Sequence, residues 1–384
     1  MITDDYPPNI GGIAAHVYEL SRALQTKGHE VQVYFWDPEK RSSVEHGSVP
    51  VMFLGTKKKG LWPRGFFKSF PLAHELQEIK AGFSPDIIHL HASAPLSLAM
   101  RWLGSDPACR RIFTNHSSGY LYMTRRPGGR IKARFYCGAF DGLIAPSEEL
   151  LRESSFLGIP KSNCRYIPNG VDPDRFFPFD RYQARKELNL PQNSRIILAT
   201  RRFVVKNGLR FLAQALIEAV RELENLLCVY CGSTGDDKEF SVVQSIVTAN
   251  GLEKNVLFAG SVPNTLIPKY LAACDLMVLP SLIEATSISC LEAMSMARPV
   301  IGTKTGGIPA LIADGKTGLL VNPGDSVELA AAIISALRND NLPEMGLTAR
   351  KKVEDCFSWA AVSQKTIDYY EEILKYETNK RGTG

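Results

Sequence analysis

Two glutamates, Glu284 and Glu292, stand eight positions apart in a segment whose residue types could bind an anion and several hydroxyl groups. An apolar run ends at Pro280, a polar loop follows it, and we expect a helix to begin near Ser289. At the carboxyl end of a parallel strand such a loop faces a ligand crevice, where the N–H groups of Ile288 and Ser289 could receive a diphosphate. Glu284 could then accept hydrogen bonds from sugar hydroxyls, and Glu292 from the vicinal hydroxyls of a ribose.

A simpler interpretation of the same residues stays open. Ser289 and Glu292 have the spacing of a capping box, in which the serine and glutamate side chains bond to the backbone at the start of a helix. On this interpretation Glu292 only stabilises the helix. The segment by itself fits both interpretations equally well.

Gly11 and Gly12 lie at an expected turn from a strand to a helix. Glycines let a ligand approach the backbone closely, and a helix N-terminus offers N–H groups to an anion, although many such turns carry glycine for steric reasons alone. Only Met1 and Ile2 remain for the strand before this turn, whereas a strand normally has about five residues. We expect either a shortened first strand or a start site placed too late.

Short apolar strands alternate with amphipathic helices along the chain, a pattern typical of parallel sheets with crossover helices. A turn-rich segment over residues 166–172 separates two series of strands, and 384 residues exceed what one hydrophobic core usually serves. We therefore expect two α/β domains, with helices over 13–27 and 359–376. The expected strands are 30–35, 86–90, 111–114 and 142–145 in the first half, and 195–200, 226–231, 256–259, 276–279, 299–302 and 318–321 in the second.

Composition and charge narrow the class of protein. With 45% hydrophobic and 22% charged residues and no apolar run of 18, the chain is typical of soluble globular proteins, and without an opening signal segment we expect it in the cytoplasm. Residues 1–170 hold 21 Lys/Arg against 15 Asp/Glu and all seven histidines. This basic half suits an anionic partner or membrane surface, or is simply a solvated face. Cys228 and Cys231 have C-x-x-C spacing, but we expect reduced core thiols there rather than a zinc site.

The succession of motifs resembles the retaining glycosyltransferases of family 4, whose signature is a glutamate, seven residues, and a second glutamate followed by Ala-Met or similar. The resemblance covers nearly the full chain. Besides the segment with the two glutamates, it rests on Pro8-x-x-Gly11-Gly12, Pro85-Asp86-Ile87-Ile88-His89-Leu90-His91, Ala145-Pro146-Ser147-Glu148, Ile167-Pro168-Asn169-Gly170-Val171-Asp172 and Phe357-Ser358-Trp359.

The resemblance implies an α/β protein with the GT-B fold, in which two Rossmann-like α/β domains face each other across a cleft and a C-terminal helix returns to the N-terminal domain. On this basis residues 1–172 form an acceptor-binding domain that is joined by the closing helix, residues 360–384. Residues 173–359 form the domain that binds the nucleotide sugar.

The resemblance also implies roles for individual residues. Glu284 matches the glutamate that contacts the donor sugar, and Glu292 matches the one that binds the ribose. His116 resembles the histidine beside the transferred sugar, with a hydrogen-bonded core histidine as the simpler alternative. The remaining candidates on the donor side are Gly11, Gly12, Ser287, Ile288 and Ser289, and those on the acceptor side are His91, Arg125 and Arg126.

The diphosphate clamp of the family, an arginine followed five positions later by a Lys-Gly pair, is irregular here. Arg202 fits, but the lysine position falls on Asn207, and Lys206 comes one residue early. Either Lys206 turns into the phosphate site or the clamp is weaker, and Arg201 could compensate. Residues 285–286 also differ from the family pattern, which leaves the donor sugar open.

We therefore expect retaining transfer of a hexose-type sugar from a UDP- or GDP-linked donor to a hydroxyl of a glycan or lipid-linked acceptor, in the biosynthesis of cell-envelope polysaccharide or lipopolysaccharide. Cationic side chains and helix dipoles predict a reaction without metal or other cofactor. Basic segments with aromatic residues, over 57–68 and 120–134, predict peripheral contact with the anionic inner face of the plasma membrane, and we expect no nucleic-acid partner. The alternatives are an inactive scaffold subunit and a sugar-nucleotide epimerase, whereas a nicotinamide-dependent dehydrogenase is disfavoured because no G-x-G-x-x-G follows the first strand.

Overall fold

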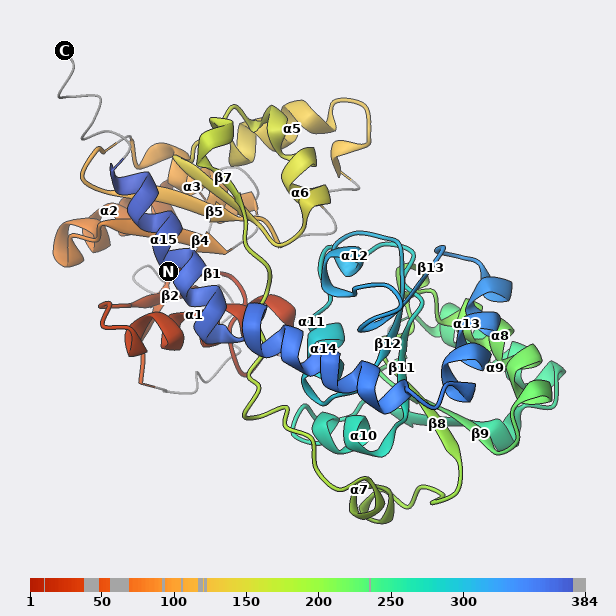
Figure 1. The fold of residues 1–384 in the computed structure, drawn as a ribbon. Coiled ribbons are helices and arrows are strands. Elements are labelled where there is room, and N and C mark those ends of the chain that lie inside the picture. The colour runs from red at the N-terminus through yellow and green to blue at the C-terminus, as the bar shows by residue number, and fades with distance from the viewer. Residues whose placement is uncertain are drawn as a thin grey trace. The chain divides into compact units, whose positions relative to one another are not determined.

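The computed structural model describes residues 1–9, 11–37, 48–55, 69–91, 94–104, 106–116, 120, 123–234 and 236–375. The chain divides into two compact units (Figure 1): unit 1 comprises Met1–Asn169 with Trp359–Gly384, and unit 2 comprises Gly170–Ser358. The sequence placed the divisions after residues 172 and 359, so the boundaries in the structure lie slightly earlier.

Unit 1 is built on a seven-stranded parallel sheet in the order β3-β2-β1-β4-β5-β6-β7. The order of the strands reverses between β1 and β4, and ligands of such doubly wound sheets bind beyond the carboxyl ends of the strands at this switch point. The strands are β1 (Ile2–Thr3), β2 (Val33–Trp36), β3 (Val51–Leu54), β4 (Ile87–His91), β5 (Arg110–Thr114), β6 (Gly142–Ala145) and β7 (Cys164–Tyr166).

Strand β1 contains only Ile2 and Thr3, although it lies in the middle of the sheet. Ile2 pairs with Tyr34 of β2 and with Leu90 of β4. The amino group of Met1 donates a hydrogen bond to the carbonyl oxygen of Gln32 at 2.6 Å, and burial lowers the pKa of this amine to about 5.

Helices cover the sheet of unit 1, and the last helix of the chain is one of them (Figure 1). Val17 and Leu20 of α1 pack in one hydrophobic core with Trp359 and Val362 of α15. The expected return of the closing helix to the N-terminal domain is therefore confirmed. The helices are α1 (Gly12–Thr26), α2 (Ser69–Phe83), α3 (Ala94–Trp102), α5 (Gly129–Cys137), α6 (Glu148–Glu153) and α15 (Trp359–Lys375).

Unit 2 repeats the doubly wound plan with a six-stranded parallel sheet in the order β10-β9-β8-β11-β12-β13. Its switch point lies between β8 and β11, which are hydrogen-bonded neighbours. The strands are β8 (Arg195–Thr200), β9 (Leu226–Cys231), β10 (Val256–Gly260), β11 (Leu276–Leu279), β12 (Val300–Thr303) and β13 (Gly318–Val321).

Two separate hydrophobic cores fill the two faces of this sheet. One face is covered by α8 (Leu209–Glu222), α9 (Asp237–Ala249) and α13 (Ser326–Arg338). The other face carries α7 (Arg181–Glu187), α10 (Ile267–Ala273), α11 (Ile288–Ser295), α12 (Ile308–Leu311) and α14 (Leu342–Cys356).

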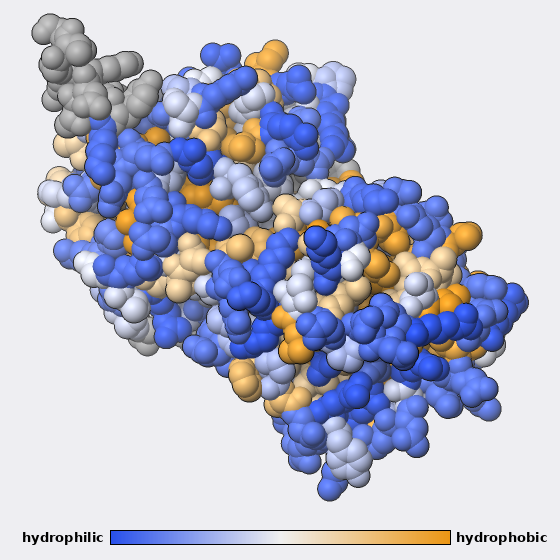
Figure 2. Space-filling view, in the orientation of Figure 1, coloured by the Kyte–Doolittle hydropathy of each residue, from blue (hydrophilic) through white to orange (hydrophobic). Residues whose placement is uncertain are grey.

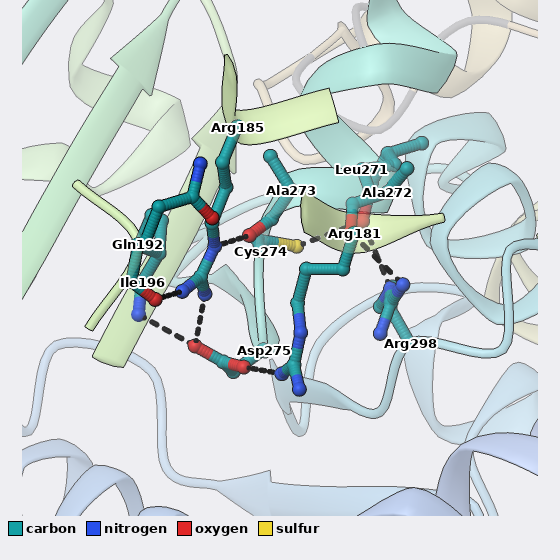
Figure 3. A network of polar contacts seen from close by, with 10 residues as sticks. All are labelled: Arg181, Arg185, Gln192, Ile196, Leu271, Ala272, Ala273, Cys274, Asp275 and Arg298. Atoms are coloured by element: carbon teal, nitrogen blue, oxygen red, sulfur yellow. Dashed lines mark hydrogen bonds and ion pairs between the residues drawn. The ribbon is translucent and has the colours of Figure 1, made fainter. Parts of the chain in front are cut away.

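The amino edge of the unit 2 sheet is closed by a polar network around Asp275 (Figure 3). The Asp275 carboxylate accepts hydrogen bonds from the N–H of Ile196 at 2.7 Å and from Nη2 of Arg185 at 2.9 Å. It also pairs with Arg181, while Arg185 donates to the carbonyl oxygen of Ala273. The network joins α7 to the N-terminal ends of β8 and β11. It therefore holds the two switch-point strands at the end opposite to the candidate site, which lies at their C-terminal ends.

The face drawn in Figure 2 is mostly hydrophilic, with hydrophobic side chains scattered across it. Within the described ranges, no helix has both the length and the apolar character needed to cross a membrane.

Candidate active site

In unit 2 the candidate residues lie on two loops at the carboxyl ends of the switch-point strands. The first loop (residues 201–208) follows β8, and the second (residues 280–287) follows β11. The structure therefore brings the arginine and lysine of the irregular clamp to the same edge of the sheet as the first signature glutamate.

Backbone contacts fix the two loops against each other. The carbonyl oxygen of Lys206 accepts hydrogen bonds from the N–H groups of Leu282 at 2.8 Å and Ile283 at 3.2 Å. Gly208 has a φ of +67°, and a Cβ atom there would collide with the carbonyl oxygen of Pro280. Only glycine combines this backbone conformation with so close an approach, which explains the Asn207-Gly208 turn.

An ion pair joins the loops through their side chains. Nη2 of Arg201 pairs with the carboxylate of Glu284 and also donates to Oγ of Ser281 at 3.0 Å. The two charged side chains are only 16% and 13% exposed, and burial lowers the pKa of Arg201 to about 10. Glu284 is therefore held by a fixed counter-charge. The sequence indicated Arg201 only as a substitute for the clamp lysine, so this contact was missed.

Arg202 and Lys206 place further positive charge beside this pair. Arg202 is exposed, and Lys206 is partly buried. Desolvation and the neighbouring charges of Arg201 and Arg202 lower the pKa of Lys206. Such mutual repulsion among cations favours an anionic ligand at this edge.

Asn207 has a structural role instead of replacing the clamp lysine. Its side chain is buried, and Nδ2 donates to the carbonyl oxygen of Arg202 at 2.7 Å. The second cation of the clamp could come from position 206 or position 207. Lys206 carries the charge, and this charge interacts with those of Arg201 and Arg202.

Helix α11 begins at Ile288, and Ser287 caps it by accepting a hydrogen bond from the N–H of Cys290 at 3.2 Å. The capping-box interpretation of Ser289 and Glu292 is therefore wrong, because Ser289 already lies inside the helix. The N–H groups of Ile288 and Ser289 are in the first turn, where helix geometry leaves them without intrahelical partners. They have the position that an anion-binding role requires.

Glu292 lies in the second turn of α11 and is partly exposed. Burial raises the pKa of its carboxyl to about 7, against the opposing effect of Arg175 and Arg201. This group therefore changes charge near neutral pH, and its ionised form can accept charge-assisted hydrogen bonds from both hydroxyls of a ribose, one on each oxygen.

In unit 1 the glycine candidates lie at the start of α1. Gly11 is the N-cap residue in an extended conformation, and Gly12 is the first residue of the helix. A Cβ atom on Gly11 would approach Oδ2 of Asp5 to 2.8 Å, so a larger residue there would displace the Asp5 side chain. Gly12 is exposed, and its N–H belongs to the first turn, where an anion could bind.

Four histidines converge at the switch point of unit 1: His16 of α1, His89 and His91 of β4, and His116 after β5. The ring centroids of His89 and His91 lie 3.9 Å apart, so these two residues share one face of the strand. Those of His16 and His116 lie 4.5 Å apart. Burial lowers the pKa of all four imidazoles, that of His16 to about 4. The cluster is therefore uncharged at pH 7.

Within this cluster His116, the candidate for the sugar-facing position, is partly exposed, and its Nε2 lies 3.1 Å from Nδ1 of His91. His91 is completely buried, which corrects the expectation that it lines an acceptor surface. His16, His91 and His116 each offer one ring nitrogen, and these nitrogens lie within 4.8 Å of one another, a spacing that could hold a metal ion.

The other basic candidates lie on the surface of unit 1. Arg125 and Arg126 are exposed, and Nη2 of Arg125 pairs with Oε1 of Glu149 at 2.7 Å. Segment 57–68 lies outside the described residues. In unit 2, Cys228 and Cys231 are buried free thiols in β9.

Two protein-family models match this chain. The model described as Glycosyltransferase Family 4 matches residues 10–175, and the model described as Glycosyl transferases group 1 matches residues 180–352. Together they cover most of both units. The chain belongs to glycosyltransferase family 4. It is therefore a glycosyltransferase, as the spacing of the two glutamates indicated.

Relatives of this glycosyltransferase align over nearly their whole lengths. N-acetyl-alpha-D-glucosaminyl L-malate synthase of Bacillus anthracis is 27% identical over 371 residues, which are 95% of this chain and 94% of the relative. The GDP-mannose-dependent monoacylated alpha-(1-6)-phosphatidylinositol monomannoside mannosyltransferase of Corynebacterium glutamicum is 26% identical over 381 residues, 95% of each chain.

The fold is shared with Anabaena Alr3699/HepE, whose structure was solved in complex with UDP and glucose. The two structures superpose with a TM-score of 0.77 at 20% identity, over 97% of this chain and 99% of the other. The expected GT-B architecture of two Rossmann-like domains with parallel sheets is therefore confirmed.

Proposed function

We propose that this glycosyltransferase moves a hexose-type sugar from a UDP- or GDP-linked donor to a hydroxyl of a glycan or lipid-linked acceptor in cell-envelope polysaccharide or lipopolysaccharide biosynthesis, with retention of anomeric configuration. The observation that supports this most is the Arg201–Glu284 ion pair across the unit 2 switch point, with Arg202 and Lys206 beside it. The corynebacterial relative is named as dependent on GDP-mannose, a donor of this class.

Each part of the donor would have a counterpart in unit 2. The diphosphate would lie between the cations Arg202 and Lys206 and the first turn of α11, where two N–H groups and the helix dipole favour negative charge. Glu284, held in place by Arg201, would accept hydrogen bonds from the sugar hydroxyls, and Glu292 from the ribose. In unit 1, the start of α1 at Gly12 would offer a further N–H to the phosphates, and His116 would lie beside the transferred sugar.

In the proposed reaction the acceptor oxygen attacks the anomeric carbon on the face from which the diphosphate leaves. The bond from that carbon to the phosphate oxygen breaks, the bond to the acceptor oxygen forms, and the acceptor proton passes to the departing phosphate oxygen. Arg202 and Lys206 stabilise the charge that develops on the leaving group, so this mechanism uses no metal ion or other cofactor. Because both signature glutamates have binding roles, neither acts as the covalent nucleophile of a double displacement.

A conservative substitution of Glu284 tests this assignment. We expect Glu284→Gln to lower turnover by at least about 100-fold, because a neutral amide holds the sugar hydroxyls and Arg201 less firmly. The measurement is release of nucleotide diphosphate and of glycosylated product from a panel of UDP- and GDP-sugars, with envelope glycans and lipid-linked sugars as acceptors.

A matched control is Glu239→Gln, because Glu239 is also a buried glutamate that pairs with an arginine, Arg210 on α8. It should weaken folding to a similar degree and leave the turnover of the folded enzyme intact. Full turnover in Glu284→Gln would refute the donor site. A wild-type chain that neither hydrolyses a donor nor transfers a sugar would indicate an inactive scaffold.

The membrane-facing surface that we propose is helix α5 of unit 1. Ile131 and Phe135, one helical turn apart, are 79% and 42% exposed, and they alternate with the exposed cations Arg130, Lys132 and Arg134. Exposed apolar side chains among cations favour the interface of an anionic bilayer. This contact would bring the enzyme to a lipid-linked acceptor at the inner face of the plasma membrane.

Co-sedimentation with vesicles tests this surface. We expect binding to vesicles that contain anionic lipid and not to neutral ones, and we expect Ile131→Ser with Phe135→Ser to reduce it at least about tenfold. Val327→Ser in unit 2 is the control, since Val327 is also 79% exposed. Binding that does not depend on anionic lipid would favour a water-soluble acceptor, as the name of the Bacillus relative indicates for that enzyme.

A further inference from the structure

Three histidines that are distant in sequence meet at the switch point of unit 1. His16 comes from α1, His91 ends β4, and His116 follows β5. One ring nitrogen from each lies within 4.8 Å of the others. Nε2 of His91 is fully buried and has no hydrogen-bond partner in the described part of the chain. A buried polar atom without a partner is uncommon in native proteins and calls for a ligand.

The surroundings of the cluster prepare these nitrogens for coordination. Asn169 Oδ1 accepts the hydrogen of His16 Nδ1 at 2.9 Å, which leaves the lone pair on Nε2 of His16. Such an outer contact fixes the tautomer and the ring orientation of histidine ligands in metal sites. The neighbouring His89 is already engaged, since its two nitrogens contact Tyr370 Oη and Thr114 Oγ1 at 2.6 Å each. The remaining set is therefore His16, His91 and His116, in which Nδ1 of His91 and Nε2 of His116 share a hydrogen bond of 3.1 Å.

We propose that His16, His91 and His116 bind one Zn²⁺ ion, with the fourth coordination position open on the partly exposed side of His116. Three histidines with an open position are a known zinc ligand set, and imidazole nitrogen suits Zn²⁺ far better than Mg²⁺ or Ca²⁺. A tetrahedral ion about 2.1 Å from each nitrogen spaces its ligands about 3.4 Å apart. The rings therefore need only a modest inward movement, since the three nitrogens already lie within 4.8 Å of one another.

Occupation of this site would inhibit sugar transfer. Zn²⁺ would take the lone pair of His116 and place two positive charges at its ring, while the proposed reaction uses that ring beside the sugar and takes its counter-charge from Arg202 and Lys206. The inhibition rests on the proposed function, whereas the binding itself does not.

Cobalt substitution tests the binding directly. Untagged, metal-free full-length protein is titrated with Co²⁺, and we expect the visible absorption of four-coordinate cobalt at one ion per chain, lost on addition of Zn²⁺. His91→Gln and His116→Gln should each abolish the band. His74→Gln should keep it, because His74 is an exposed residue on α2. Folding of each variant is checked by circular dichroism.

Three results would overturn the proposal: no visible band in the wild type, a band that persists in both folded variants, or a thiolate-to-cobalt charge-transfer band that places the ion on a cysteine. Activity is assayed separately with added Zn²⁺. Cobalt binding by a protein that transfers no sugar would refute the proposed function and keep the metal site. Sugar transfer without a cobalt band would refute the metal site and keep the proposed function.

Discussion

Units 1 and 2 share a doubly wound sheet and a switch point, but they fill the switch point with opposite chemistry. Unit 1 gathers four uncharged histidines there. Unit 2 gathers three cations and two carboxyl groups: Arg201, Arg202, Lys206, Glu284 and Glu292. Burial disfavours charge in both units, so it lowers the pKa of the bases in unit 1 and raises the pKa of Glu292 in unit 2. The shared topology puts a binding site at the switch point of each unit, and the side chains at that site determine which ligand can bind.

The largest expected difference is in the acid stability of unit 1. Below about pH 6.5 an unfolded chain binds a proton on each histidine, whereas the folded cluster stays neutral to much lower pH. The unfolded state then binds more protons, so the free energy of unfolding falls as the pH drops below 6.5. The slope is up to about 5 kcal/mol per pH unit for four histidines.

Tryptophan fluorescence can follow this transition, because all four tryptophans of the chain, at positions 36, 62, 102 and 359, belong to unit 1. Urea midpoints are compared at pH 7 and pH 5.5 in the presence of EDTA. An unchanged midpoint would contradict a neutral histidine cluster.

Unit 2 should show the opposite slope through Glu292. Its carboxyl has a pKa of about 7 when folded and 4.5 in the reference state, so between these values the folded state binds the additional proton. The free energy of unfolding of unit 2 therefore decreases as the pH rises from 4.5 to 7, by up to about 3 kcal/mol. Glu292→Gln should remove this slope. Far-UV circular dichroism follows the unfolding of both units in urea, whereas tryptophan emission follows unit 1 alone. The difference between the two curves reports the unfolding of unit 2.

The same titration predicts pH-dependent donor binding. Affinity for the nucleoside diphosphate should increase through pH 7 as Glu292 ionises, and Glu292→Gln should bind weakly at every pH. Calorimetry at pH 6 and pH 8 gives the affinity of each protein at both pH values. If the ratio of the affinity at pH 8 to that at pH 6 is the same in the wild type and in the variant, Glu292 is excluded from the ribose site.

A smaller effect concerns Asn207. Asn207→Ala should lower stability by about 1 kcal/mol, because the carbonyl oxygen of Arg202 loses one of its two donors and keeps only the N–H of Val204. Asn207→Lys should not improve the clamp, although it restores the family residue, since the new charge would enter a buried position. The exposed Asn193→Ala is the control for stability. Tighter donor binding by Asn207→Lys would show that position 207 can face the phosphates.

The smallest effect compares two helix caps, one in each unit. Ser147 caps α6 and Ser287 caps α11, both are fully buried, and each accepts a hydrogen bond at 3.2 Å. Replacement of either serine by alanine should cost about 1 kcal/mol of stability. Only Ser287→Ala should also raise the KM for the donor, because α11 carries the proposed phosphate contacts. Equal KM values in the two variants would argue against that role.

The sequence allowed most strands to be placed within one to three residues, because each one between helices is a short buried apolar run. Strands β3 and β7 were missed. β7 is an edge strand with a partly exposed Cys-Arg-Tyr sequence, so it lacks the apolar character that marks the buried strands. For α11, Ser287 and Ser289 were equally suitable caps by residue type, and only the structure shows which one accepts the N–H bond.

The contacts that define the two candidate sites could not be read from local patterns. Arg201 and Glu284 are more than eighty positions apart in sequence and meet only because β8 and β11 are neighbours at the switch point. The i, i+2 spacing of His89 and His91 accounts for their common face, because alternate residues of a strand point to the same side. Their meeting with His16 depends on how α1 packs on the sheet, which no short segment encodes.

Helix α15 has a consequence for how the protein is made. During translation, unit 2 is synthesised in one continuous stretch, whereas the core of unit 1 lacks Trp359, Val362 and Tyr369 until the last helix has left the ribosome. We expect the nascent chain to complete its second domain before its first. During that interval the N-terminal part of unit 1 would expose the apolar sheet face that α15 later covers. We expect chaperones to bind the nascent chain at this face.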